Sequence, residues 1–143
     1  MTNSKPHPIT LDKVFFTRSV VIAIPEHMPV PDVVVQGPVN NINVVKLEGE
    51  PGRYNAQMRA VMNPTAEKSS PYSIDMECIA ELRADDTLTE EEAMRAINIT
   101  AHSVLYGAIR EAVVWITSRQ PYGPLMLGLS ILQTSVPPES TTP

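Results

Sequence analysis

Two segments in the middle of the chain alternate apolar and polar residues with a period of two. Residues 54–62 follow the pattern except at Val61, and residues 72–83 follow it except at Ile79. Successive side chains of a β-strand point to opposite faces, so the pattern predicts two strands with one buried and one wet face. A sheet wetted on one face is typical of antiparallel pairing. The buried face is predicted to hold Tyr54, Ala56, Met58, Ala60, Met62, Tyr72, Ile74, Met76, Cys78, Ala80 and Leu82.

Two further segments complete the predicted sheet. Residues 11–25 are rich in β-branched and aromatic side chains, which favours a strand, and Pro25 ends it. Residues 42–48 carry Val44, Val45 and Leu47 and precede a Pro-Gly turn at positions 51 and 52. We therefore expect four strands.

A long helix is predicted after the strands. Thr89 and Glu92 have the spacing of a capping box, which predicts a helix beginning near Glu90. From residue 103 to residue 119 the apolar side chains fall on an arc about twice as wide as the roughly 100° stripe of an ordinary surface helix. The helix is therefore expected to pack on the sheet with one side and on a second surface with the other. A partner subunit is the simplest candidate for that second surface. The arc comprises Val104, Leu105, Ala108, Ile109, Ala112, Val113, Trp115 and Ile116.

The helix is followed by a turn and an apolar run. Residues 120–124 read QPYGP, which ends the helix because proline cannot continue it. Residues 125–132 read LMLGLSIL and carry too many apolar side chains for one face of a short strand. The polar, proline-containing residues 1–8 and 133–143 are expected to be disordered tails, so residues 9–132 form the predicted domain.

Charge and cysteine content narrow the class of protein. The formal net charge is -5 and the basic residues are scattered, so nucleic-acid binding is not expected. Cys78 is the only cysteine, which rules out an internal disulfide. The chain shows neither a signal peptide nor an apolar run long enough for a bilayer, and a cytoplasmic protein without membrane insertion is expected.

No pattern of catalytic or metal-binding residues is present. His7, His27 and His102 are widely separated, and His102 is expected to be an ordinary histidine on the helix surface. Cys78 lies on the apolar face of a predicted strand, where cysteine usually acts as a small hydrophobic residue. The acidic residues near Glu90 are explained by the helix start. We predict no enzymatic activity, no metal and no cofactor.

The stretch from Val104 to Leu132 resembles the SecB family of export chaperones. The resemblance rests on an aromatic residue at Tyr106, an Arg-Glu pair at positions 110 and 111, Ser118-Arg119 at the helix end, an aromatic residue at Tyr122, and the spaced Leu125 and Leu127. Residues 14–25, VFFTRSVVIAIP, look like the first strand of that family. The resemblance implies an α+β fold in which a four-stranded antiparallel sheet carries a long helix on one face, within a dimer or tetramer.

The resemblance also implies sites. The expected client-binding residues are Ile42, Val44, Tyr122, Leu125, Met126, Leu127, Leu129 and Ile131. The expected subunit interface comprises Tyr106, Arg110, Val113, Val114 and Trp115, with Arg110 and Glu111 as a surface or interface charge pair.

Two departures from the family bear on its partners. Ser19 and Ala23 stand where the family carries acidic residues that dock on the SecA motor, and no second helix follows the apolar run. Docking on SecA is therefore not implied for this chain.

Two functions follow as hypotheses. The first is an ATP-independent holdase that binds unfolded or partly folded polypeptides in apolar grooves, as in protein export. The second is a dedicated adaptor, inhibitor or toxin-antitoxin-associated protein that binds one specific partner on the same scaffold.

Overall fold

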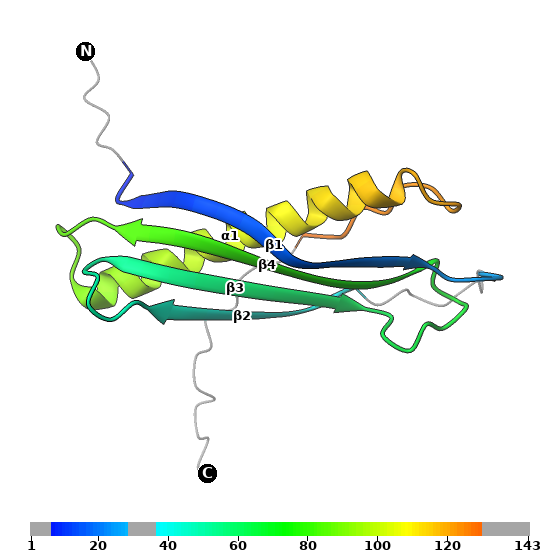
Figure 1. The fold of residues 1–143 in the computed structure, drawn as a ribbon, viewed down its shortest axis with the longest axis horizontal. Helices are drawn as coiled ribbons and strands as arrows, with labels where there is room; N and C mark the ends of the chain where they lie inside the picture. The colour runs from blue at the N-terminus through cyan, green and yellow to red at the C-terminus, as the bar shows by residue number, and fades with distance from the viewer. Residues whose placement is uncertain (1–6, 29–36, 130–143) are drawn as a thin grey trace, which may run out of the picture.

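The computed structural model describes residues 7–28 and 37–129, which form one sheet and one helix. The sheet is antiparallel throughout, with strand order β1-β4-β3-β2, and α1 runs obliquely across one of its faces (Figure 1). This architecture confirms the predicted α+β class. The elements are β1 (Ile9–Ala23), β2 (Val39–Lys46), β3 (Arg53–Met62), β4 (Tyr72–Ala84) and α1 (Glu90–Thr117).

The two outer strands begin earlier than the sequence predicted. β1 begins at Ile9, which pairs with Ala84 of β4, and it stops before Pro25. β2 begins at Val39 because its first residues pair with the end of β3, although asparagine at positions 40 and 41 has low β-propensity. Pairing with a neighbouring strand overrides the local preference there.

The buried face of the sheet is the face that α1 covers. All the predicted inward residues of β3 and β4 are at most 5% exposed, and Ile79 points to the opposite face. The helix packs mainly on β4, β3 and β1 and touches β2 least. Its buried series repeats every four residues, which is the spacing of one helix face. That series is Ala93, Ile97, Ala101, Leu105, Ile109, Val113 and Thr117.

The predicted capping box is formed at the start of α1. The Thr89 hydroxyl accepts the backbone N–H of Glu92 at 3.1 Å, and the Glu92 carboxylate accepts the backbone N–H of Thr89 at 3.0 Å. Both bonds satisfy amides that have no partner within the helix. The helix is continuous for 28 residues from this cap.

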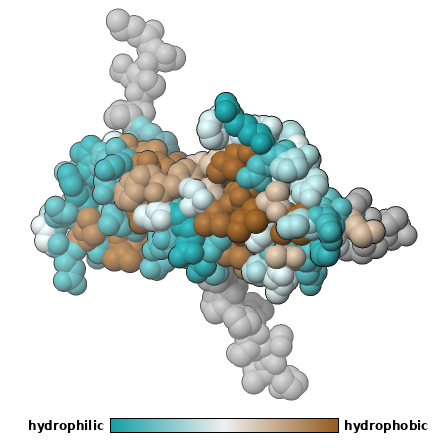
Figure 2. All heavy atoms as spheres, turned by 45° about the vertical axis from the view of Figure 1, so that its right-hand side comes forward, coloured by the Kyte–Doolittle hydropathy of each residue, from teal (hydrophilic) through white to brown (hydrophobic). Residues whose placement is uncertain are grey.

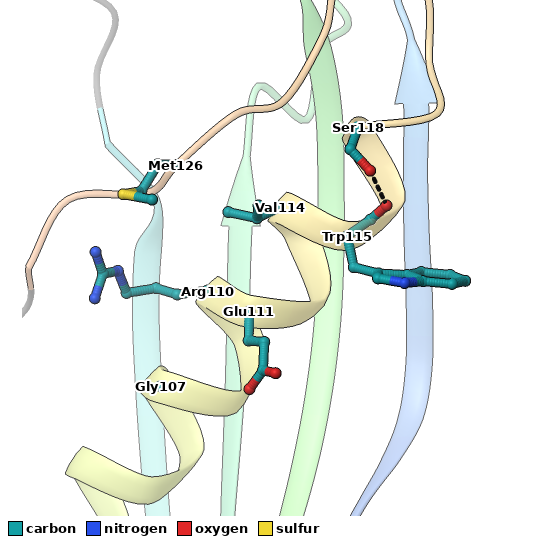
Figure 3. A pocket seen from close by; sticks show the side chains of 7 residues that line it. All are labelled: Gly107, Arg110, Glu111, Val114, Trp115, Ser118 and Met126. Atoms are coloured by element: carbon teal, nitrogen blue, oxygen red, sulfur yellow. Dashed lines mark hydrogen bonds between the residues drawn. The ribbon is translucent and has the colours of Figure 1, made fainter.

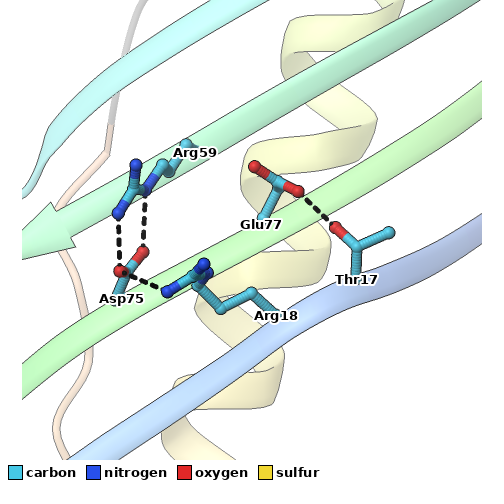
Figure 4. A network of polar contacts seen from close by, with 5 residues as sticks. All are labelled: Thr17, Arg18, Arg59, Asp75 and Glu77. Carbon is cyan, nitrogen blue, oxygen red and sulfur yellow. Dashed lines mark hydrogen bonds and ion pairs between the residues drawn. The ribbon is translucent and has the colours of Figure 1, made fainter.

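The open face of the sheet carries a network of ion pairs (Figure 4). Asp75 accepts two hydrogen bonds from Arg59, at 2.9 and 2.7 Å, and a third from Arg18 at 3.3 Å. Hydrogen bonding to Arg59 is the main cause that lowers the pKa of Asp75. The Glu77 carboxylate accepts the Thr17 hydroxyl at 2.6 Å. Asp75 and Glu77 are therefore matched by donors of the same sheet.

His102 does not lie on the helix surface as predicted. It is 8% exposed and its ring stacks on that of Tyr106, with centroids 6.2 Å apart. Burial lowers the pKa of His102, because a charged imidazolium is poorly solvated there. The helical periodicity did not predict this burial, because histidine occurs both in protein interiors and on protein surfaces.

Candidate functional site

Residues 123–129, here called the strap, form no helix or strand and run back along α1 after the turn at residues 118–122. Gly123 has a positive φ of 81°, a backbone conformation that glycine adopts without steric cost. The strap therefore passes beside the helix that precedes it in the sequence.

The strap has no polar side chain, and its hydrogen bonds are made by its backbone. Its carbonyl groups accept hydrogen bonds from three side chains: Tyr72 to Gly123 at 2.7 Å, Tyr106 to Gly128 at 2.6 Å, and Arg110 Nε to Leu127 at 2.8 Å. The Leu125 N–H donates to the Thr117 hydroxyl at 2.8 Å. These anchors come from β4 and α1, so the sheet and the helix position the strap together.

A second contact fixes the turn that leads into the strap. The Tyr122 hydroxyl donates to the carbonyl of Ile24, just after β1, and accepts the backbone N–H of His27 at 3.4 Å. The Tyr122 ring also packs edge-on against the rings of His27 and Tyr72. The beginning of the strap is thereby tied to the end of β1.

Side chains of the strap divide between the core and the surface. Leu127 is 3% exposed and belongs to the hydrophobic core, and Leu125 packs against that core. Met126 and Leu129 are 70% and 86% exposed. The strap thus buries one set of side chains and presents another to solvent.

Tyr106 connects the strap to β2. Its hydroxyl bonds the Gly128 carbonyl and also interacts with the side chain of Asn40 in β2. Burial raises the pKa of Tyr106, while the nearby Arg110 and the hydrogen bond with Asn40 act in the opposite direction. Ile42 and Val44 of β2 lie on the helix side of the sheet, half-buried against the same core. The strap, Tyr106 and these two β2 residues together define the candidate binding surface.

An apolar hollow adjoins the strap on the outer side of α1 (Figure 3). This hollow, here called the helix hollow, has a volume of about 470 Å³. Val114 lies at its centre, with Met126 and Trp115 toward opposite sides. It is lined by Gly107, Arg110, Glu111, Val114, Trp115, Ser118 and Met126.

Exposed apolar groups occur at this hollow and at other places on the molecular surface. Figure 2 shows brown, hydrophobic surface gathered in patches between hydrophilic regions. Trp115 is 63% exposed, with the Arg119 guanidinium 5.2 Å from its ring centroid. Exposed apolar patches of this kind mark interaction sites more often than isolated apolar residues do.

The predicted site residues fall into three groups. Met126, Leu129 and Tyr122 are exposed, Ile42, Val44 and Leu125 are half-buried, and Leu127 is buried. Ile131 lies outside the described residues. Of the predicted interface residues, Trp115 is exposed, Val114 and Arg110 are half-buried, and Tyr106 and Val113 are buried within the chain.

Arg110 and Glu111, the expected surface or interface charge pair, point in different directions from α1 (Figure 3). Arg110 donates to the strap backbone, and the Glu111 carboxylate points away from it (Figure 3). Arg110 therefore has a positioning role that the sequence did not indicate.

Several comparisons with known proteins bear on the fold. The sequence matches no protein-family model, and the search of curated proteins finds no match. A similar solved structure is that of a SecB-like chaperone from Mycobacterium tuberculosis in complex with a ChAD peptide from the HigA1 antitoxin. It aligns with a TM-score of 0.60 and 18% sequence identity, over 88% of each chain. The fold is SecB-like.

A second structure shares this SecB-like fold in part. It is a protein of unknown function from Streptococcus agalactiae, with a TM-score of 0.55 and 8% identity, covering 85% of this chain and 97% of that one. The low identities mean that the likeness concerns the fold and not particular side chains.

Thr117 is a residue of the candidate site that the sequence analysis did not predict. It has no exposed surface, and its hydroxyl donates to the Val113 carbonyl at 2.6 Å while accepting the Leu125 N–H. The available signal was its place in the helix, four residues after Val113 on the buried face. A buried hydroxyl needs a hydrogen-bond partner, and the strap supplies one.

Side chains that could together bind a metal ion do not gather in the described part of the chain. Within residues 7–28 and 37–129, no three His, Cys, Asp or Glu side chains lie together as a metal site requires. The Cys78 thiol is fully buried, which raises its pKa to about 11. Within the same residues, no helix has the length and apolar character needed to cross a membrane.

Proposed function

We propose that this protein is an ATP-independent chaperone that binds unfolded or partly folded polypeptides along the strap and β2. The observation that carries the proposal is the strap itself, which exposes Met126 and Leu129 while its backbone is held in place. Non-native chains share exposed apolar side chains but no common sequence. A fixed backbone bearing outward apolar groups suits that kind of ligand.

The side chains of the surface fit ligands of varied shape. Methionine is unbranched and polarisable, so Met126 can adapt to different apolar partners. Ile42 and Val44 extend the apolar strip on the β2 side. The similar chaperone bound to an antitoxin peptide supports polypeptide binding on this scaffold.

That same comparison favours a second candidate function. A peptide from one antitoxin is a specific partner, so a dedicated adaptor or inhibitor for a single protein is the alternative. Ser19 and Ala23 also favour the adaptor, because they offer no acidic group for docking on SecA. They pair with Met76 and Tyr72 and so lie on the helix side of the sheet.

We also propose that the chain works as a homo-oligomer, a dimer or a tetramer. The support is β1, which lies at the edge of the sheet and leaves Phe16, Val20 and Ile22 36%, 37% and 54% exposed. An exposed edge strand offers backbone groups and apolar side chains that a second subunit can cover. Sedimentation analysis of the purified full chain measures the assembly state directly.

Suppression of aggregation tests the chaperone proposal. A chemically unfolded model protein is diluted into buffer with increasing amounts of this protein and no nucleotide, and light scattering is recorded. The double variant Met126→Ser, Leu129→Ser should lose most of the suppression. The matched control Met28→Ser, Ile99→Ser removes similarly exposed apolar groups, 68% and 53% exposed, outside the strap and should retain it.

The result also separates the two candidates. Suppression near one oligomer per client supports a chaperone. Absence of suppression, together with recovery of one stoichiometric partner from lysate, favours the adaptor. If the strap variant and the control variant suppress aggregation equally well, the strap is not part of the binding site.

A further inference from the structure

The helix hollow is lined in part by Gly107, and packing within the described chain does not explain why this residue is a glycine. Gly107 lies in the middle of α1, where glycine costs roughly 1 kcal/mol relative to alanine. A Cβ atom placed on Gly107 would meet no heavy atom within 4 Å, so nothing inside the described chain requires a glycine there. A missing side chain instead allows an external backbone to approach the helix closely.

The walls of the hollow are apolar and its border carries an arginine with unused donors. Val114, Trp115 and Met126 supply the apolar surface. The Arg110 Nε donates to the Leu127 carbonyl, and its terminal nitrogens have no hydrogen-bond partner among residues 7–28 and 37–129. The bond to Leu127 holds the guanidinium in place, which reduces the entropy lost when a ligand binds.

The charges around the hollow favour an anionic ligand group. Arg110 lines it and Arg119 stacks on Trp115, whereas Glu111 is the one acidic residue of the lining. Glu111 is exposed and well solvated, so pairing it with a cation gains little. Arg110 is half-buried, and a guanidinium presents parallel donors that match a carboxylate. The net charge of -5 acts over longer distances, where salt screens it within about 8 Å at physiological ionic strength.

We propose that the helix hollow binds a partner peptide in which an apolar side chain lies next to a glutamate or aspartate. The apolar side chain packs between Val114, Trp115 and Met126, and the carboxylate accepts hydrogen bonds from Arg110. Gly107 gives room for the peptide backbone. This inference rests on the proposed polypeptide-binding function and specifies the chemistry that one part of the surface selects.

A pair of labelled peptides tests the inference. Both carry two leucines in a Gly-Ser background, and they differ only in having glutamate or glutamine between the leucines. Fluorescence anisotropy with the full chain gives the two dissociation constants. We expect the glutamate peptide to bind about tenfold more tightly, because a charge-assisted hydrogen bond is stronger than a neutral one. Trp115 is the only tryptophan, so its emission reports directly on the hollow.

Variants separate charge recognition from loosening of the strap. Arg110→Gln should abolish the preference for glutamate, and Arg110→Lys should retain only part of it. Tyr106→Phe removes another strap anchor without changing the charge, so it should weaken both peptides while keeping the preference.

Four outcomes would overturn the inference. They are equal affinities for the two peptides, an undiminished preference in Arg110→Gln, binding that leaves Trp115 emission unchanged, and a concentration-dependent Trp115 shift without peptide. The last would mean that a second copy covers the hollow. If the inference alone fails, both peptides still bind or the chain still suppresses aggregation. If the proposed function fails, neither peptide binds and aggregation proceeds.

Discussion

The Tyr106 hydroxyl donates to the Gly128 carbonyl at 2.6 Å, so a helix side chain binds the backbone of the strap. The two residues are 22 positions apart in the sequence. Arg110 makes the equivalent bond to Leu127 one helical turn further on. The path of the strap therefore depends on helix side chains, while its own outward side chains remain available for contact.

Replacing Tyr106 with phenylalanine should loosen the end of the strap. The variant loses a buried hydroxyl and its bond to Gly128, which should lower the free energy of unfolding by about 1 kcal/mol. Backbone amides of the strap should exchange faster with deuterium. Tyr54→Phe is the control, because no hydrogen bond of the Tyr54 hydroxyl is found in the described chain and its ring is equally buried. Equal effects of both variants would contradict the role of Tyr106.

Replacing Thr117 with valine should detach the beginning of the strap. Valine has nearly the same shape but cannot accept the Leu125 N–H, so a half-buried donor loses its partner at a cost of about 1–3 kcal/mol. Thr117→Ser keeps the hydroxyl. We expect fast hydrogen exchange at Leu125 in the valine variant and near-native protection in the serine variant. Native protection in both would show that Thr117 does not hold the strap.

Leu127 and Leu129 should respond very differently to serine. Leu127 is 3% exposed, and its loss should cost roughly 2–4 kcal/mol because a core side chain is removed. Leu129 is 86% exposed, so Leu129→Ser should change stability by less than about 0.5 kcal/mol. Urea denaturation measures both. Similar midpoints for the two variants would mean that the strap does not contribute to the core.

Most of the sheet could be predicted from the sequence because its two central strands are amphipathic with a period of two. Burial of one face determines the register, since a shift by one residue would turn the inward apolar side chains of β3 or β4 toward solvent. The helix start was likewise encoded locally in Thr89 and Glu92. These features depend on neighbouring residues or on simple periodicity.

The strap could be recognised only as an apolar run. Its bonds join residues 8 to 51 positions apart, such as Leu125 with Thr117 and Gly123 with Tyr72, and they run from side chain to backbone. A repeating pattern of apolar residues does not predict hydrogen bonds between side chains and distant backbone groups. The sequence therefore grouped Leu125, Leu127 and Leu129 as equivalent, although the core takes the first two and leaves the third in solvent.

The single cysteine should make stability fall in alkaline solution. The native Cys78 thiol keeps its proton up to a pKa of about 11 because it is buried, whereas an unfolded cysteine releases its proton near pH 8.5. Below that pH both states are protonated and the free energy of unfolding is unaffected. As the pH rises from about 9 to 11, the unfolded state is increasingly favoured, by up to roughly 2–3 kcal/mol.

Comparison with Cys78→Ala isolates this contribution, because lysine and tyrosine residues titrate in the same range in both proteins. Urea denaturation at several pH values between 8 and 11 gives the two curves. The difference in unfolding free energy between native protein and variant should shrink above pH 9 and stay constant below it. Parallel curves across the whole range would mean that Cys78 ionises as readily in the folded chain as in the unfolded one, which its complete burial beneath α1 opposes.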